Sequence, residues 1–201
     1  MIRVLLADDQ SLVRGALAAL LDLEPDLEVV SQVGSGSEVV QAARQHSVDV
    51  CLLDIEMPGM NGIEAAAAVR AQLPGTRSLI VTTFGRPGYV RRALEAGASG
   101  FVVKDTPARL LADAVRKVHA GLRVVDPDLA TESLLAGQNP LTEREADILR
   151  LARDGSTVAS MAARAHLSQG TVRNHLSSAI GKTGASTRAE AARTAEDNGW
   201  L

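Results

Sequence analysis

Short apolar runs alternate with amphipathic segments along the first part of the chain. The apolar runs, rich in β-branched residues, predict strands at residues 2–7, 28–33, 50–53, 78–82 and 100–103. Apolar residues at helical spacing predict helices between and after them, at residues 11–23, 37–45, 62–72, 88–96 and 108–120. Strand–helix units of this kind are typical of a doubly wound parallel sheet with helices on both faces. We therefore expect an α/β domain with a five-stranded parallel sheet over residues 1–121.

The pattern changes after residue 121. Residues 122–139 contain two Pro-, Asn-, Asp- or Gly-rich stretches, which predict a linker, with room for one short helix. Beyond it the β-rich runs stop, and helical spacing predicts four helices at residues 143–153, 158–165, 169–181 and 188–198. We expect a second, smaller all-α domain with a helix-turn-helix over residues 140–201.

Several predicted helices have polar residues at their expected starts. Ser11, Ser37 and Asn61 are predicted N-caps in the first domain. In the second, Thr142 followed three residues later by Glu145 predicts a capping box.

Composition narrows the class of protein. Only 2% of the residues are aromatic while 46% are hydrophobic, so the cores must be built from Ala, Val, Leu and Ile. Cys51 is the single cysteine, which excludes an internal disulfide and a cysteine metal cluster and predicts a small core residue. The apolar start of the chain is too short for a signal peptide, and no apolar run reaches about 18 residues. We expect a cytoplasmic protein that does not contact a membrane.

The net charge of -3 conceals a local asymmetry. No Asp or Glu occurs from Gly155 to Ala189, so we expect Arg164, Arg173, Lys182 and Arg188 to stand unopposed by acids. A polyanion can approach such a segment. A solvated face with a chance gap in acids is the alternative interpretation.

Acids and their partners fall at the ends of the predicted strands. Asp8 and Asp9 end the first strand, Asp54 the third, Thr82 the fourth and Lys104 the fifth. Ligands of open α/β sheets bind beyond the carboxyl ends of the strands, so we expect one shared crevice. Carboxylates gathered there need a cation, and Mg²⁺ suits oxygen ligands. Asp54 would then serve as a nucleophile toward a phosphoryl group, assisted by Thr82 and Lys104. Each residue alone is also explained as a turn former or helix cap.

The segment 158–181 predicts two short helices joined by a turn, as in a helix-turn-helix. One arc of its second helix is apolar and the opposite arc polar and free of acids: Val172, Leu176, Ala179 and Ile180 against Arg173, Asn174, Ser177 and Ser178. Arg173 suits a guanine edge or a phosphate, and Asn174 an adenine edge. Ser168, Thr171 and Lys182 are placed for backbone phosphates. An ordinary amphipathic surface helix is the alternative.

Three stretches resemble the receiver domains of two-component response regulators: residues 6–10 (LADDQ), 53–59 (LDIEMPG) and 97–105 (GASGFVVKD). This resemblance implies that Asp54 accepts the phosphoryl group. It implies that Asp8, Asp9, Asp54 and the backbone carbonyl of Glu56 bind Mg²⁺. It also implies a switch pair of Thr82 and Phe101, with Phe101 at a position where the family often has Tyr; Thr83 is the adjacent alternative to Thr82.

Residues 141–145 (LTERE) and 167–176 (LSQGTVRNHL) resemble the LuxR-type output domain of NarL/FixJ regulators, although Ser177 stands where that family often has a basic residue. The combination implies a transcription regulator and not an enzyme. Its expected partners are a cognate sensor histidine kinase, double-stranded promoter DNA and, when phosphorylated, a second copy of the chain. Two alternatives stay open: a Mg²⁺-dependent phosphohydrolase that forms an aspartyl phosphate, and a DNA-binding protein whose first domain is an unphosphorylated scaffold.

Overall fold

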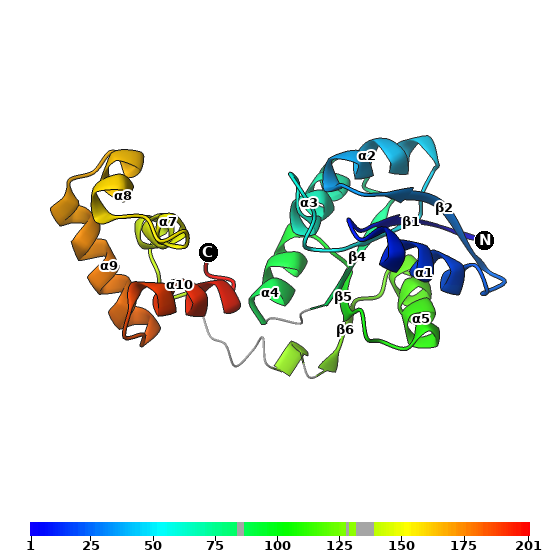
Figure 1. Ribbon diagram of the computed structural model, residues 1–201. Coiled ribbons are helices and arrows are strands. Elements are labelled where there is room, and N and C mark those ends of the chain that lie inside the picture. The colour runs from blue at the N-terminus through cyan, green and yellow to red at the C-terminus, as the bar shows by residue number, and fades with distance from the viewer. Residues whose placement is uncertain (84–86, 128, 132–138) are drawn as a thin grey trace. The chain divides into compact units, whose positions relative to one another are not determined.

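The computed structural model describes residues 1–83, 87–127, 129–131 and 139–201. They form two units, the first within residues 1–130 and the second consisting largely of residues 131–201. The α/β unit and the helical unit occur in the predicted order (Figure 1). Part of the predicted linker, residues 128 and 132–138, lies outside the described residues, whereas residues 127 and 129–131 are helical.

A parallel sheet of order β2-β1-β3-β4-β5-β6 forms the centre of the first unit. Each strand pairs in parallel with its neighbours. The strands are β1 (Ile2–Ala7), β2 (Leu27–Val33), β3 (Val50–Leu53), β4 (Arg77–Thr82), β5 (Gly100–Val103) and β6 (Val124–Val125). The order reverses between β1 and β3, which makes the carboxyl ends of these two strands the expected ligand site.

The prediction of five strands was wrong by one. The sixth strand, β6, lies inside the predicted linker and pairs Val124 with Gly100 and Val125 with Phe101. A Cβ atom on Gly100 would lie 2.7 Å from the carbonyl oxygen of Val124, so the close approach of β6 depends on glycine. A strand of two residues is too short to produce a periodic signal, and only its pairing with β5 defines it.

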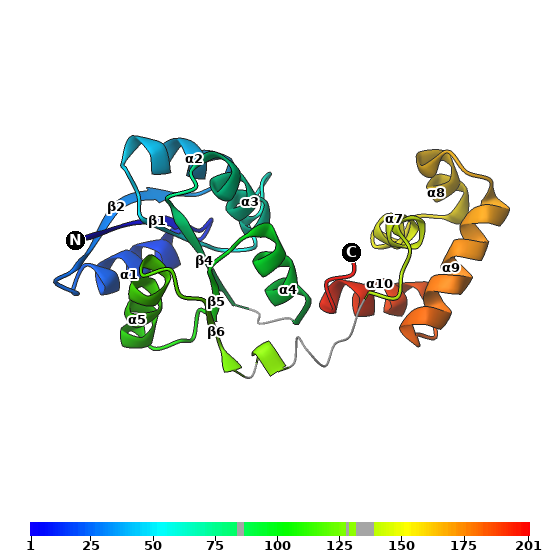
Figure 2. The same ribbon diagram turned by 180° about the vertical axis from the view of Figure 1, so that it is seen from behind.

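Helices cover both faces of the sheet: α1 (Ser11–Leu21), α2 (Gly36–Gln45), α3 (Gly62–Gln72), α4 (Pro87–Ala96) and α5 (Ala108–His119). Figures 1 and 2 show α1 and α5 on one face and the other three on the opposite face. Asn61 caps α3, as predicted, and forms a capping box with Glu64. Ser11 and Ser37 were the wrong caps, because Gln10 and Ser35 occupy those positions; the Ser35 side chain accepts the Ser37 N–H.

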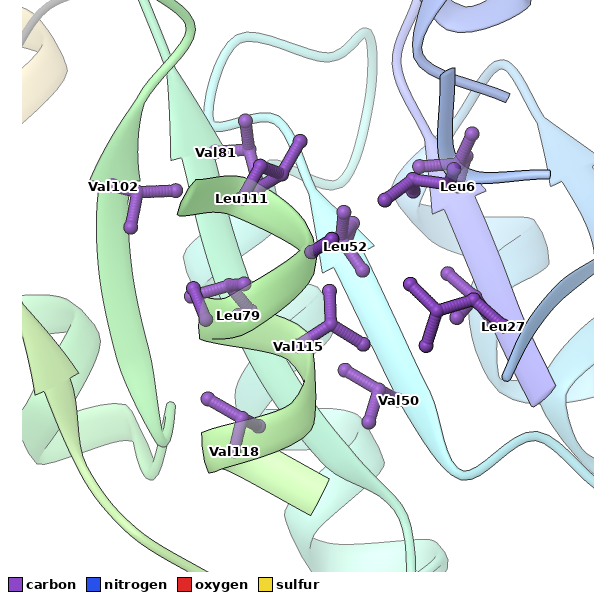
Figure 3. Packing of buried hydrophobic residues seen from close by; sticks show 14 of the residues in the cluster. Leu6, Leu27, Val50, Leu52, Leu79, Val81, Val102, Leu111, Val115 and Val118 are labelled. Carbon is purple, nitrogen blue, oxygen red and sulfur yellow. The ribbon is translucent and has the colours of Figure 1, made fainter. Parts of the chain in front are cut away.

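Apolar side chains fill the space between the sheet and the helices α1 and α5. Val50 and Leu52 of β3 and Leu79 of β4 face Leu111 and Val115 of α5 (Figure 3). The alternate residues of the strands are also buried against the opposite face, among them Leu5, Leu53, Ile80 and Cys51. Burial raises the pKa of the Cys51 thiol to about 12, which fits the predicted core residue. A sheet buried on both faces explains the nearly continuous apolar character of its strands.

The second unit contains the four predicted helices, with ends shifted by at most two residues: α7 (Glu143–Ala152), α8 (Val158–Ala165), α9 (Gln169–Thr183) and α10 (Arg188–Asp197). Hydroxyl side chains accept an N–H of the first turn at all four starts; these caps are Thr142, Thr157, Ser168 and Thr187. The core is small and rich in alanine, with Leu149, Met161 and Val172 as larger members. In the described part of the chain, no helix has both the length and the apolar character needed to cross a bilayer.

Candidate functional site

Three carboxylates meet at the carboxyl ends of β1 and β3. Asp8 and Asp9 follow β1, and Asp54 follows β3, which is the neighbouring strand. One carboxylate oxygen from each lies within 4.8 Å of the others. Asp8 and Asp54 are buried, at 3% and 4% exposure, whereas Asp9 is exposed. Like charges at this separation repel, so the three carboxylates need a positive charge close by.

Lys104 supplies part of that charge. Its Nζ lies 2.8 Å from Oδ2 of Asp8 and 2.9 Å from Oδ2 of Asp54, with only 10% of the side chain exposed. Its backbone N–H donates to the carbonyl of Thr82 (2.7 Å), which fixes the lysine beside the end of β4. One ammonium therefore serves two buried carboxylates.

Backbone N–H groups orient both buried acids. The N–H of Ile55 donates to Oδ1 of Asp54 at 2.8 Å, and the N–H of Gln10 donates to Oδ1 of Asp8 at 2.9 Å. Glu56 lies exposed in the loop that follows Asp54. This loop packs tightly against the start of α3, since a Cβ atom on Gly62 would lie 2.0 Å from the carbonyl oxygen of Asp54. Gly62 therefore allows the helix to begin directly behind the acid.

The charges in this site affect one another's ionisation. Burial raises the pKa of Asp54, and the nearby Asp8 adds to that effect, while the hydrogen bond and charge of Lys104 oppose it. Burial alone would lower the pKa of Lys104, but the hydrogen bonds with Asp8 and Asp54 outweigh it and the pKa is raised. The lysine is therefore held charged between the two acids.

Thr82 and Phe101 lie on one face of the sheet. The register pairs Ile80 with Phe101 and Thr82 with Val103, and side chains of paired residues in a parallel sheet point the same way. Both are buried, Thr82 at 3% and Phe101 at 0% exposure. Thr83, the alternative to Thr82, is exposed. Burial on the shared face therefore favours Thr82 as the member of the pair.

Arg14 is a neighbour of this site that the sequence reasoning missed. Its guanidinium Nη1 donates to the backbone carbonyl of Asp8 from the first turn of α1. The side chain also passes close to Gly34, where a Cβ atom would lie 3.7 Å from Nη1. The position of Arg14 six residues after Asp8, across a strand-to-helix turn, was the available signal.

The second unit contains a helix-turn-helix made of α8 and α9. His166 ends α8 in the left-handed region, with φ 55°. Ser168 then starts α9, accepting the N–H of Thr171 through its Oγ, and the two hydroxyls lie 2.8 Å apart. The turn therefore redirects the chain within three residues.

The exposed face of α9 is polar, as predicted. Val172, Leu176 and Ala179 are buried and Ile180 is partly buried, whereas the opposite arc is exposed, namely Arg173, Asn174, Ser177 and Ser178. The guanidinium of Arg173 donates to Oε1 of Gln169 at 3.3 Å, which leaves both at the surface. Ser178 differs from the other three because its hydroxyl donates to Oε1 of Glu145 at 2.6 Å.

The prediction that the cations of residues 155–189 stand unopposed was wrong for two of them. Lys182 Nζ lies 2.7 Å from Oε2 of Glu145, and Arg164 Nη1 lies 3.1 Å from Oδ2 of Asp154. Both acids lie outside the segment in sequence but fold against it. Burial opposes the charge of Glu145, but hydrogen bonds from Lys182 and Ser178 lower its pKa to about 2. Glu145 therefore links α7 to α9 as a charged group.

Two family models match the chain. The response regulator receiver domain matches residues 4–116, and the luxR family of bacterial regulatory proteins matches residues 139–195. The uncharacterized transcriptional regulatory protein YvfU of Bacillus subtilis is 45% identical over 201 residues, with 100% of each chain covered. The transcriptional regulatory protein DesR of the same organism is 41% identical, also with 100% of each covered.

A solved structure is similar over the same length. The response regulator ChrA of a heme-sensing two-component system has a TM-score of 0.61 and 33% identity, covering 100% of this chain and 98% of that one. The similarity therefore includes both the unit with the three carboxylates and the unit with the helix-turn-helix.

Proposed function

The chain belongs to the two-component response regulators that join a receiver domain to a LuxR-type output domain, and we propose that phosphorylation of Asp54 controls its binding to promoter DNA. DNA binding and regulation of transcription are its general function.

One observation carries the proposal: the buried Asp54 shares the ammonium of Lys104 with Asp8. Asp54 Oδ1 is held by a backbone N–H, and its Oδ2 by the lysine. A carboxylate fixed at both oxygens and placed at the sheet's switch point is oriented for attack on an incoming group.

Asp8, Asp9, Asp54 and the backbone carbonyl of Glu56 would hold Mg²⁺. The donor set fits, because the three carboxylates offer oxygen atoms within 4.8 Å of one another and the single contacting ammonium leaves their charge only partly balanced. When bound, the ion would offset the negative charge of an approaching phosphoryl group.

The donor in this proposal is a phosphohistidine of the cognate sensor kinase. An oxygen of Asp54 attacks phosphorus, the new O–P bond forms as the P–N bond breaks, and that electron pair leaves with the imidazole. Lys104 holds a phosphoryl oxygen with one of its three N–H donors while it keeps Asp8. The Thr82 hydroxyl donates to another, which draws the end of β4 toward the site.

Phe101 responds to that movement. It is fully buried on the face that Thr82 shares, so a shift of Thr82 changes the space available to its ring. Tightly packed buried side chains can adopt only a few alternative arrangements. Such a site therefore changes between two states and does not deform continuously. Thr82 and Phe101 would thereby pass the state of Asp54 to the surface of the receiver.

The output unit binds DNA through α9 in the major groove. The exposed side chains Arg173, Asn174 and Ser177 face the bases, while Ser168 and Thr171 at the helix start contact phosphates. Lys182 contributes less than an unpaired lysine, because its ammonium already binds Glu145. Its side chain is still 35% exposed, which leaves donors for a phosphate.

Phosphorylation promotes a homodimer in this proposal. The base-facing arc of α9 carries one arginine, so a single output unit binds weakly, and pairing raises the effective concentration of the second unit at the DNA. We assign residues 1–121 to the receiver, 122–139 to the linker and 140–201 to the output domain. The strand β6 falls within the linker range but pairs with the receiver sheet.

Phosphodonor labelling of Asp54→Asn tests the proposed phosphoacceptor. Wild-type protein with Mg²⁺ and phosphoramidate is expected to gain one phosphoryl group by intact-protein mass spectrometry, and Asp54→Asn none. Asp105→Asn is the matched control, since Asp105 is an exposed acid next to Lys104. Equal labelling of Asp54→Asn would remove Asp54 from its role, and loss of labelling in Asp105→Asn would show that the effect is not specific.

A further inference from the structure

A second site lies at the opposite edge of the receiver sheet from Asp54. A cavity of about 430 Å³ opens where β4 and β5 begin, bordered by the ends of α3, α4 and α5. Three arginines line it: Arg70, Arg77 and Arg123. Among the described lining residues there is neither Asp nor Glu. The cavity therefore concentrates positive charge in a receiver that is otherwise rich in acids.

Among the residues that the structure describes, these three arginines have no acidic partner. Within the described residues, no carboxylate lies at ion-pairing distance from any of the three guanidinium groups. Arg116 of α5 shows the contrast, because its guanidinium binds three carboxylates: Glu24, Asp26 and Asp113. Gathering unpaired cations around one hollow costs electrostatic energy, which an anion in the cavity would recover.

A glycine, Gly97, leaves space for the side chain of Arg70. Arg70 lies across Gly97, where a Cβ atom would come within 2.1 Å of its Cδ, and Gly97 has φ +100°. Its Nη1 is also 3.4 Å from the carbonyl of Glu95. A side chain at position 97 would push Arg70 away from the cavity, so glycine there keeps the guanidinium at the rim.

Hydroxyl groups add neutral donors. Ser78, at the start of β4, is only 3% exposed and lines the cavity, and the described residues provide no hydrogen bond for its hydroxyl. Ser99 lines the cavity from the neighbouring strand and donates its backbone N–H to the carbonyl of Ser78. A hydroxyl at the wall of an arginine-lined hollow is suited to bind an oxyanion.

We propose that this cavity binds a small molecule carrying at least two phosphate groups. Guanidinium groups match phosphate oxygens in geometry and charge, and the volume lies in the range of ligand pockets. The apolar lining is limited to Pro74, Leu94 and Ala98, which favours a sugar bisphosphate or an oligophosphate over a ligand with a large aromatic ring.

This site is separate from the phosphoacceptor. The strand β4 runs from Arg77 at the cavity to Thr82 at the acid site, a length of about 17 Å at the usual rise per residue. The ligand would therefore bind whether or not Asp54 is phosphorylated.

Isothermal titration calorimetry on the full chain tests the proposal. The probes are inorganic pyrophosphate and fructose 1,6-bisphosphate, with fructose as the uncharged control, at constant ionic strength and with EDTA to exclude metal-mediated binding at the carboxylates. Wild-type and Asp54→Asn proteins are expected to bind one bisphosphate per chain with equal affinity. Arg77→Gln and Arg123→Gln are expected to weaken binding about tenfold or more, and Ser78→Ala several-fold, because each removes a donor to the phosphates.

Arg44→Gln is the matched control, because Arg44 is an exposed arginine of the same unit that does not line the cavity. The arginines at 77 and 123 are exposed, so their variants are expected to keep the wild-type circular dichroism spectrum. Absence of saturable binding of both probes at millimolar concentration would overturn the proposal. An equal loss of affinity in Arg44→Gln would show that binding depends on the general charge of the unit and not on the cavity. A loss of affinity in Asp54→Asn would place binding at the acid site. Either result would overturn the proposal as well.

Discussion

Each unit buries a carboxylate beside a lysine, and the two pairs differ in how many donors each carboxylate receives. In the receiver, the ammonium of Lys104 is divided between Asp54 and Asp8, and the pKa of Asp54 is raised. In the output unit, the carboxylate of Glu145 accepts hydrogen bonds from Lys182, Ser178 and the N–H of Thr142, and its pKa is lowered to about 2.

The difference separates a reactive group from a structural one. Glu145 has its charge fully compensated and joins two helices, so it has little to gain from a further cation. Asp54 has too few donors for the charge around it, and this deficit leaves it dependent on an additional cation and open to an incoming phosphoryl group. The same pair of residue types therefore gives opposite results according to the groups that surround it.

The largest expected effect comes from removing the shared ammonium. Lys104→Met leaves Asp8 and Asp54 buried side by side without the cation that both bind, so labelling of Asp54 by phosphoramidate is expected to slow about 100-fold or more. The rate is measured by mass spectrometry at saturating Mg²⁺. Lys117→Met, which removes an exposed lysine of α5, serves as the control. A wild-type rate for Lys104→Met would show that the lysine has no part in phosphoryl transfer.

The next effect is on the stability of the output unit. Glu145→Gln removes the charge that Lys182 binds and is expected to lower the free energy of unfolding by about 2 to 3 kcal/mol. Trp200 is the only tryptophan and packs against the core of this unit, so its fluorescence reports unfolding in urea. Glu143→Gln changes an exposed acid of the same helix and should stay near wild type. Equal stability of the two variants would contradict the structural role of Glu145.

The pH dependence of that contribution follows from the lowered pKa. Because Glu145 titrates near 2 in the folded state and near 4.5 when unfolded, its contribution is complete above the unfolded value and is lost as pH falls through the folded one. The difference in unfolding free energy between wild type and Glu145→Gln is therefore expected to be constant from about pH 8 to 6 and to shrink from about pH 5 to 3. A difference in unfolding free energy that grows on acidification would contradict a stabilising role of the charged Glu145.

The smallest expected effect is on DNA affinity, and it distinguishes Arg173 of α9 from Lys182, which forms an ion pair with Glu145. Arg173→Gln is expected to weaken DNA binding about tenfold and leave urea stability unchanged, because within the described residues the guanidinium of Arg173 donates a hydrogen bond to Gln169 and forms no ion pair. Lys182→Gln is expected to weaken DNA binding less but to destabilise the output unit, because it leaves Glu145 without its cation. Fluorescence anisotropy with labelled DNA measures the affinities, and Arg193→Gln on α10 is the exposed control. The opposite ranking of the two variants would show that Lys182 is the main DNA contact.

Most helices and strands could be predicted from the sequence because each is long enough to show a clear periodic pattern of apolar residues. The strand β6 was missed, since two valines give no period and acquire their structure from β5. Two helix caps were misplaced by one or two residues, where Gln10 and Ser35 precede equally plausible serines.

The acid site was accessible from the sequence because strand topology brings the ends of β1, β3 and β5 together. The pairing of Glu145 with Lys182 was not, since 37 residues separate them and each has a sufficient local explanation, one as a capping residue and one as a phosphate contact. The contact of Arg14 with Asp8 was also missed, although the position of Arg14 six residues after Asp8, across the strand-to-helix turn, was a signal for it.

DNA affinity measured with and without phosphorylation tests the central claim most directly. A DNA sequence is first selected from a random library by wild-type protein treated with phosphoramidate and Mg²⁺, and its affinity for wild type and Asp54→Asn is then measured with and without the donor. The donor is expected to tighten wild-type binding about tenfold or more, as pairing of two output units provides, and to leave Asp54→Asn unchanged. Fully labelled wild-type protein with unchanged affinity, or an equal response in Asp54→Asn, would contradict control of DNA binding by Asp54.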